Sequence, residues 1–238
     1  MPSSNIRAVI ADMALPEGDT QLSPLAARTA TACVAAPVVL GFVYFGSPFF
    51  EFLIVIMALI LAFEWNRLCS GRPLWLALGV IYIAVPCWAL LHLRADATAG
   101  ATNLFWLLAV VWASDTGAYA FGRLIGGAKL APVISPNKTW AGFLGGIGTA
   151  GLTGALTGLI LELNEILVIA GLSALIGAIS QVGDLGESWV KRHFGVKDTG
   201  AILPGHGGLF DRVDGLLVAA VAVAVIGTVG KGNILTWM

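Results

Sequence analysis

Two aspartates just before an apolar segment are the most prominent candidates for chemistry in this sequence. Asp211 and Asp214 are three residues apart, so a helix would place both carboxylates on one face. Carboxylates that enter an apolar segment together repel each other unless a cation separates them, and their oxygens suit Mg²⁺. The preceding His206-Gly-Gly stretch offers backbone N–H groups to phosphate oxygens. We therefore predict a magnesium and phosphate site; a solvated loop of mixed charge is the alternative.

A third aspartate lies upstream of the same loop. Asp184 ends an apolar segment, and Ser188, Lys191 and Arg192 extend its helical face if the helix continues. A carboxylate would then lie one to two turns from two cations. An ordinary capped helix end is the alternative interpretation.

Two more polar groups flank apolar segments. Ser135 and Lys138 lie beside Pro136, which is expected to form a turn before a helix whose free N–H groups favour anions. This pattern is typical of a phosphate-binding site, although a basic loop beside a membrane would have the same pattern. Asp115 follows a long apolar run and shares a helical face with Tyr119. We take Asp115 as a site carboxylate; an aspartate that only reaches the membrane interface is the alternative.

The composition indicates which solvent surrounds these groups. The chain has 238 residues, of which 58% are hydrophobic and 11% are charged, and its formal net charge is −1. A soluble globule of this size could not cover so much apolar surface, because its exterior still needs polar groups. The composition therefore excludes a soluble enzyme, a disordered chain and a basic nucleic-acid binder, and it predicts a protein embedded in lipid.

Seven apolar segments have the length of membrane spans. Backbone groups find no water in lipid, so these segments are expected to be helices of an all-α, polytopic membrane protein. We see no internal repeat, which argues against a transporter made of duplicated halves. The predicted segments are approximately 29–47, 48–64, 74–92, 103–121, 140–161, 166–185 and 215–231.

The distribution of basic residues predicts the orientation. Seven spans place eleven Lys and Arg residues on one side and only Arg94 and Lys231 on the other, so the positive-inside rule makes the first side cytoplasmic. The N-terminus is then cytoplasmic and the C-terminus outside. We divide the chain into a cytoplasmic tail (1–27), scaffold helices (28–100) and a catalytic membrane domain (101–238), whose cytoplasmic loops are 122–139 and 186–214.

The region from Ser188 to Asp214 resembles the signature of the phosphatidate cytidylyltransferases, also called CDP-diglyceride synthases. The matching positions include Lys191-Arg192, Lys197-Asp198, His206-Gly-Gly and Asp211-Arg212-Val-Asp214. The stretches Asp115 to Tyr119, Ser135 to Thr139 and Gly183-Asp184-Leu are similar to further motifs of that family, in the expected order. The resemblance covers about residues 101–230.

The resemblance implies that CTP and phosphatidate react to give CDP-diacylglycerol and pyrophosphate at the cytoplasmic face of the inner (plasma) membrane. It implies Mg²⁺ as the cofactor, leaves room for a second cation, and suggests a homodimer. The implied metal ligands are Asp184, Asp211 and Asp214, which with Lys191 and Arg192 form the catalytic set. The implied substrate-binding residues are Asp115, Ser135, Lys138, Ser188, Lys197, His206 and Arg212. For His206 the alternative is that it only anchors the loop.

Two other functions remain open from the residues. A CTP-dependent lipid-alcohol kinase could use a similar site, but the complete signature favours the cytidylyltransferase. A transporter or channel would need polar groups near both faces or in mid-membrane, whereas here they gather on one side.

Overall fold

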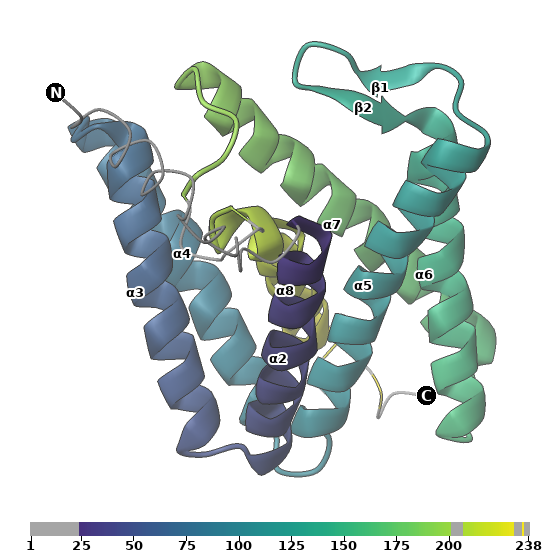
Figure 1. Ribbon diagram of the computed structural model, residues 1–238. Coiled ribbons are helices and arrows are strands. Elements are labelled where there is room, and N and C mark those ends of the chain that lie inside the picture. The colour runs from purple at the N-terminus through teal and green to yellow at the C-terminus, as the bar shows by residue number, and fades with distance from the viewer. Residues whose placement is uncertain (1–23, 201–206, 231–234, 236–238) are drawn as a thin grey trace, which may run out of the picture.

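Seven helices and one short hairpin make up the described part of the chain (Figure 1). The computed structural model describes residues 24–200, 207–230 and 235. The helices are α2 (Pro24–Phe45), α3 (Phe49–Cys69), α4 (Pro73–Arg94), α5 (Gly100–Leu124), α6 (Trp140–Ile160), α7 (Ile166–His193) and α8 (Phe210–Val229).

The helices confirm the predicted all-α membrane fold. Each helix corresponds to one of the seven predicted apolar segments, and most helix ends lie within a few residues of the predicted ends. Helices α3 to α8 are all long and apolar enough to cross a membrane, and the apolar described stretch of α2 is the shorter Cys33–Phe45. Large apolar side chains such as Phe52, Leu59 and Val80 point outward, more than half exposed. In lipid such an exterior is stable, and the chain is a multi-pass membrane protein.

The region predicted as the loop 122–139 contains the two-stranded hairpin. Strands β1 (Lys129–Ala131) and β2 (Ser135–Thr139) pair antiparallel, with Lys129 opposite Thr139. Pro136 therefore lies in a strand and does not form the expected turn; a two-stranded ribbon tolerates proline because both of its strands are edges. The Thr139 side chain then accepts a hydrogen bond from the Gly142 N–H at 3.1 Å and so caps α6.

The second predicted loop, 186–214, begins later than expected. Helix α7 does not end near residue 185 but continues to His193, and α8 begins at Phe210. Ser188, Lys191 and Arg192 therefore do extend the helix that carries Asp184. In Figure 1, α7 slants across the bundle toward the end where the hairpin lies, which we call the hairpin end.

Small residues let α5, α6 and α7 approach closely. A side chain in place of Gly146 would lie 2.7 Å from the Ser114 carbonyl oxygen of α5, and a side chain in place of Gly177 would meet Ala150 of α6. Polar groups bind across these contacts: Thr149 Oγ1 donates to the Ala113 carbonyl at 2.9 Å. Close backbone contact and interhelical hydrogen bonds are the usual stabilising interactions between helices in lipid.

We expect Gly154→Leu to destabilise this packing and Gly148→Leu to leave it intact. A Cβ at Gly154 would overlap the Ser173 side chain and lie 2.7 Å from the Ile169 carbonyl oxygen, whereas a Cβ at Gly148 meets nothing within 4 Å. Overpacking typically costs about 1–3 kcal/mol. Thermal unfolding of the two purified variants in detergent measures the difference, and equal melting temperatures would contradict it.

An aromatic cluster holds the first turn of α8 between α3 and α4. The Phe210 ring lies 5.6 Å from the ring of Trp65 and stacks on Tyr82 at 5.5 Å. Trp65 is itself fixed because its Nε1 donates to the Trp75 carbonyl at 2.7 Å. The turn that carries Asp211 and Asp214 is thereby anchored to the N-terminal half of the chain.

Candidate active site

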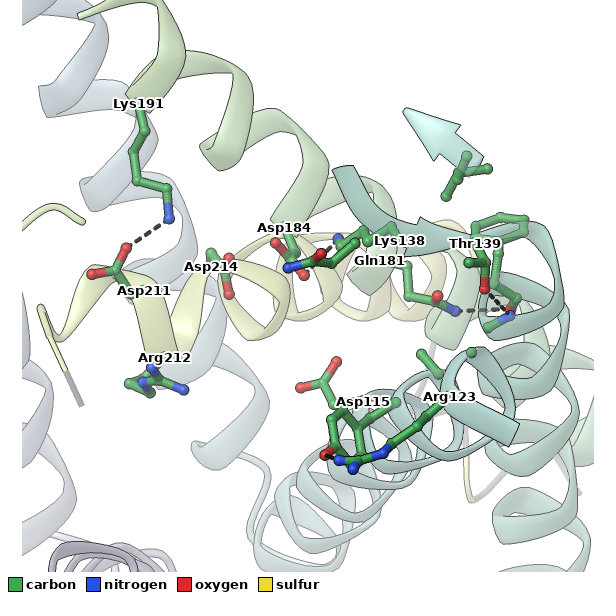
Figure 2. A pocket seen from close by; sticks show the side chains of 17 residues that line it. Asp115, Arg123, Lys138, Thr139, Gln181, Asp184, Lys191, Asp211, Arg212 and Asp214 are labelled. Carbon is green, nitrogen blue, oxygen red and sulfur yellow. Dashed lines mark hydrogen bonds and ion pairs between the residues drawn. The ribbon is translucent and has the colours of Figure 1, made fainter. Parts of the chain in front are cut away.

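A cavity of about 810 Å³ opens between α5, α6, α7, α8 and the hairpin. Figure 2 shows acidic and basic side chains around this space, with the Asp115 carboxylate on α5 pointing toward Asp184 and Asp214 and the Arg123 side chain lying along α5. The charged residues that line it are Asp115, Arg123, Lys138, Asp184, Lys191, Asp211, Arg212 and Asp214. Groups predicted from four separate stretches of sequence therefore share one site.

Three carboxylates form a compact acid cluster beside this cavity. Asp184 and Glu187 come from successive turns of α7, and Asp214 comes from α8; one oxygen of each lies within 4.8 Å of the others. Glu187 is only 3% exposed, and its Oε1 has no hydrogen-bond partner. Carboxylates this close need a cation or a proton between them. Their oxygens are the ligand type that Mg²⁺ prefers, so the described residues fit a magnesium ion.

Asp211 lies outside the acid cluster because donors already surround it. Its Oδ1 accepts a hydrogen bond from Lys191 Nζ at 2.7 Å, and its Oδ2 accepts from the backbone N–H groups of Thr199 (3.1 Å) and Gly208 (2.9 Å). Lys191 also pairs with Glu187 at 2.6 Å. The predicted trio of Asp184, Asp211 and Asp214 thus differs from the observed cluster, in which Glu187 takes the place of Asp211.

The hairpin brings a further cation to Asp184. Lys138 Nζ, on β2, lies 2.6 Å from Asp184 Oδ2, and the Ser188 hydroxyl donates to the other oxygen at 3.4 Å. Arg123 is oriented on the opposite wall, where its guanidinium donates to the Tyr119 hydroxyl at 2.7 Å. The cavity therefore combines a carboxylate cluster with several cations, which suits a phosphate-rich ligand and its metal ion.

Comparison with known proteins agrees with this chemistry. The sequence profile of the cytidylyltransferase family matches residues 72–229, about two thirds of the chain and all the residues that line the cavity. The chain belongs to the cytidylyltransferase family.

Several relatives of this chain carry the name phosphatidate cytidylyltransferase. The relative from Brucella suis is 44% identical over 178 residues, which are 75% of this chain and 64% of the relative. The relative from Rickettsia bellii is 33% identical over 214 residues, 85% of this chain and 90% of that protein. The relative from Staphylococcus saprophyticus is 39% identical over 153 residues, 64% of this chain and 58% of that protein. The chain thus spans less than two thirds of the Brucella relative's length.

Some residues predicted for the site lie elsewhere in this chain. Arg192 is exposed, and its guanidinium donates to the carbonyls of Ile134 (3.2 Å) and Val196 (2.8 Å), which ties α7 to the hairpin turn. Ser135 begins β2 outside the cavity wall, and Lys197 is exposed in the loop after α7. His206 lies outside the described residues.

The structure also places at or near the site residues that the sequence did not predict there. Glu187 follows Asp184 by three positions, the same spacing that singled out Asp211 and Asp214. Gln181 lies one turn before Asp184 and lines the cavity. Glu64 is a fully buried carboxylate within an apolar helix, and a carboxylate in such a place is a functional candidate by default. These signals were present in the sequence, although it does not show which residues face one another.

Proposed function

We propose that this chain is a phosphatidate cytidylyltransferase that makes CDP-diacylglycerol and pyrophosphate from CTP and phosphatidate. The main support is the acid cluster, which lies among cations at a cavity of an apolar helix bundle. Such a site suits a phosphate-rich substrate beside a lipid. The names of the relatives from Brucella suis and Rickettsia bellii support it.

The reaction joins two anions, and this determines what the protein must do. An oxygen of the lipid phosphate attacks the α-phosphorus of CTP, the bond from that phosphorus to the β-phosphate oxygen breaks, and pyrophosphate leaves. The attacking oxygen is already ionised, so a strong general base is unnecessary. The side chains of Lys138, Arg123 and Arg212 line the cavity, where they can offset the repulsion between the substrates and orient their phosphates.

Asp184, Glu187 and Asp214 are the proposed holders of Mg²⁺. When bound, the ion would supply positive charge against the leaving pyrophosphate. Lys191 keeps Asp211 and Glu187 in place through its two ion pairs. We therefore assign Asp211 to positioning, in contrast to the ligand role that the family resemblance implies for it.

The activity is tested with purified protein, CTP, phosphatidate and Mg²⁺. We expect CDP-diacylglycerol by mass spectrometry and an equal amount of pyrophosphate. A CTP-dependent lipid-alcohol kinase would instead release CDP when given diacylglycerol, and that result, without CDP-diacylglycerol from phosphatidate, would overturn the proposal.

We also propose that the cavity faces the cytoplasm. Tyr119, Trp140 and Trp189 are each about half exposed or more near the hairpin end, and such residues are enriched at membrane interfaces. Most of the described Lys and Arg residues lie in the connections or in the adjoining helix turns at this end, in accord with the positive-inside rule. A homodimer remains a proposal from the family resemblance, which the mass of the detergent-solubilised protein tests.

Labelling of an introduced cysteine tests the orientation. Lys197 is exposed in the loop after α7, so Lys197→Cys in a Cys33→Ser background places one accessible thiol at the hairpin end, since Cys69 and Cys87 are buried. A membrane-impermeant maleimide should label this thiol in inside-out vesicles and not in intact cells. Labelling of this thiol in intact cells would show the opposite orientation and contradict the proposal.

A further inference from the structure

Glu64 caps helix α8 although it belongs to a different helix. Its side chain lies on α3, is completely buried, and accepts hydrogen bonds from the backbone N–H groups of Leu209 (2.9 Å) and Phe210 (2.8 Å). The first N–H groups of a helix have no partner within that helix, and α8 has no side-chain cap of its own. Glu64 therefore satisfies donors that would otherwise be buried without an acceptor.

Thr199 connects Glu64 to the carboxylates of the site. The Thr199 hydroxyl lies 3.3 Å from Glu64 Oε2 and 3.2 Å from Asp211 Oδ2, and its backbone N–H donates to the same Asp211 oxygen. Asp211 in turn binds Lys191, and Lys191 pairs with Glu187 of the acid cluster. One continuous set of polar contacts thus runs from α3 to the acid cluster.

Two glycines leave the space that the Glu64 carboxylate occupies. A Cβ at Gly200 would lie 2.8 Å from Glu64 Oε1, and a Cβ at Gly208 would lie 2.9 Å from Glu64 Oε2. Both glycines belong to the loop between α7 and α8. A side chain at either position would displace the carboxylate or the loop, so this part of the loop is shaped to receive Glu64.

We propose that Glu64 is a positioning residue of the active site, which fixes the start of α8 and thereby places Asp214 against Asp184 and Glu187. The proposal rests on the proposed function. It also gives residues 28–100, predicted as scaffold, a direct part in building the site. Glu64 itself does not line the cavity and is not assigned to the substrate or the metal.

Three single variants test the proposal. Glu64→Leu removes both acceptor oxygens and keeps an apolar side chain, whereas Glu64→Gln retains one of them. Glu51→Leu removes an exposed carboxylate from the same helix and serves as the control. Each variant is purified in detergent, and its kcat, its half-saturating Mg²⁺ concentration and the rise in melting temperature on adding Mg²⁺ are measured.

We expect Glu64→Leu to lower kcat by about 10²-fold, because displacement of reacting groups by about 1 Å has that effect. Its half-saturating Mg²⁺ concentration should rise by about 10–100-fold, as it does when groups that orient metal ligands are lost. The Mg²⁺-induced rise in melting temperature should shrink accordingly. For Glu64→Gln all three values should lie between those of Glu64→Leu and those of the unaltered protein. For Glu51→Leu they should match the unaltered protein.

A purely structural cap would give a different pattern. Variants of Glu64 with a lower melting temperature but an unchanged kcat and Mg²⁺ response would overturn the proposal. If Glu64→Leu does not fold, Glu64→Gln decides by the same readouts. An unaltered protein that makes no CDP-diacylglycerol would refute the proposed function instead, and the Mg²⁺-induced stabilisation, which needs no turnover, would still test the role of Glu64.

Discussion

Asp214→Asn is expected to lower CDP-diacylglycerol formation by on the order of 10²–10³-fold while the protein stays folded and inserted in the membrane. Asparagine keeps the shape of the side chain and can still accept the hydrogen bond that Asp214 Oδ1 receives from Gly215 N–H at 2.8 Å. It removes a negative charge from the acid cluster, so Mg²⁺ binding should weaken. Initial rates over a range of Mg²⁺ concentrations measure both effects.

The control for Asp214→Asn is Glu51→Gln, which neutralises an exposed carboxylate on α3 that does not line the cavity. This control should retain normal turnover. Normal turnover and an unchanged Mg²⁺ requirement in Asp214→Asn itself would remove Asp214 from the site.

Lys191→Met is expected to reduce both turnover and stability. The Lys191 ammonium is the cation between Glu187 and Asp211, at 2.6 and 2.7 Å, and all three side chains are largely buried. Removal of one partner from a buried ion pair typically costs about 3–5 kcal/mol, because it leaves a charge uncompensated. Turnover per folded molecule and the thermal unfolding temperature in detergent separate the two effects.

The adjacent Arg192 is a matched control for Lys191. It carries the same charge but is exposed, and its guanidinium binds backbone carbonyls of the hairpin turn and the following loop. Arg192→Met should therefore change stability by no more than about 0.5 kcal/mol, as exposed substitutions usually do, with near-normal turnover. Equal losses in the two variants would mean that both cations serve the site, as the family resemblance implies.

The sequence by itself determined the membrane helices. Lipid offers no hydrogen bonds to the backbone, so a sufficiently long apolar segment must form a helix, and hydropathy finds it without tertiary information. The same approach places the end of α7 incorrectly. Residues 186–193 are mostly polar or charged, and a hydropathy pattern does not distinguish a polar helical turn from a loop.

The identity of the chemistry was also readable from residue types and spacing. A charged side chain such as Asp184 or Asp214 is energetically costly in or beside an apolar helix, and Lys138 precedes another apolar helix. The presence of these residues alone therefore indicated a site for phosphates and a cation. The spacing of three positions correctly predicted that Asp211 and Asp214 lie on one helix, near the start of α8.

Only the tertiary structure decided which carboxylates meet. Asp211 faces Lys191 and the loop N–H groups, whereas Glu187 faces Asp184 and Asp214. Glu64 reaches α8 from a helix 145 positions earlier in the chain. Contacts of this kind depend on how α3, α7 and α8 pack, and spacing along the sequence describes only one helix at a time.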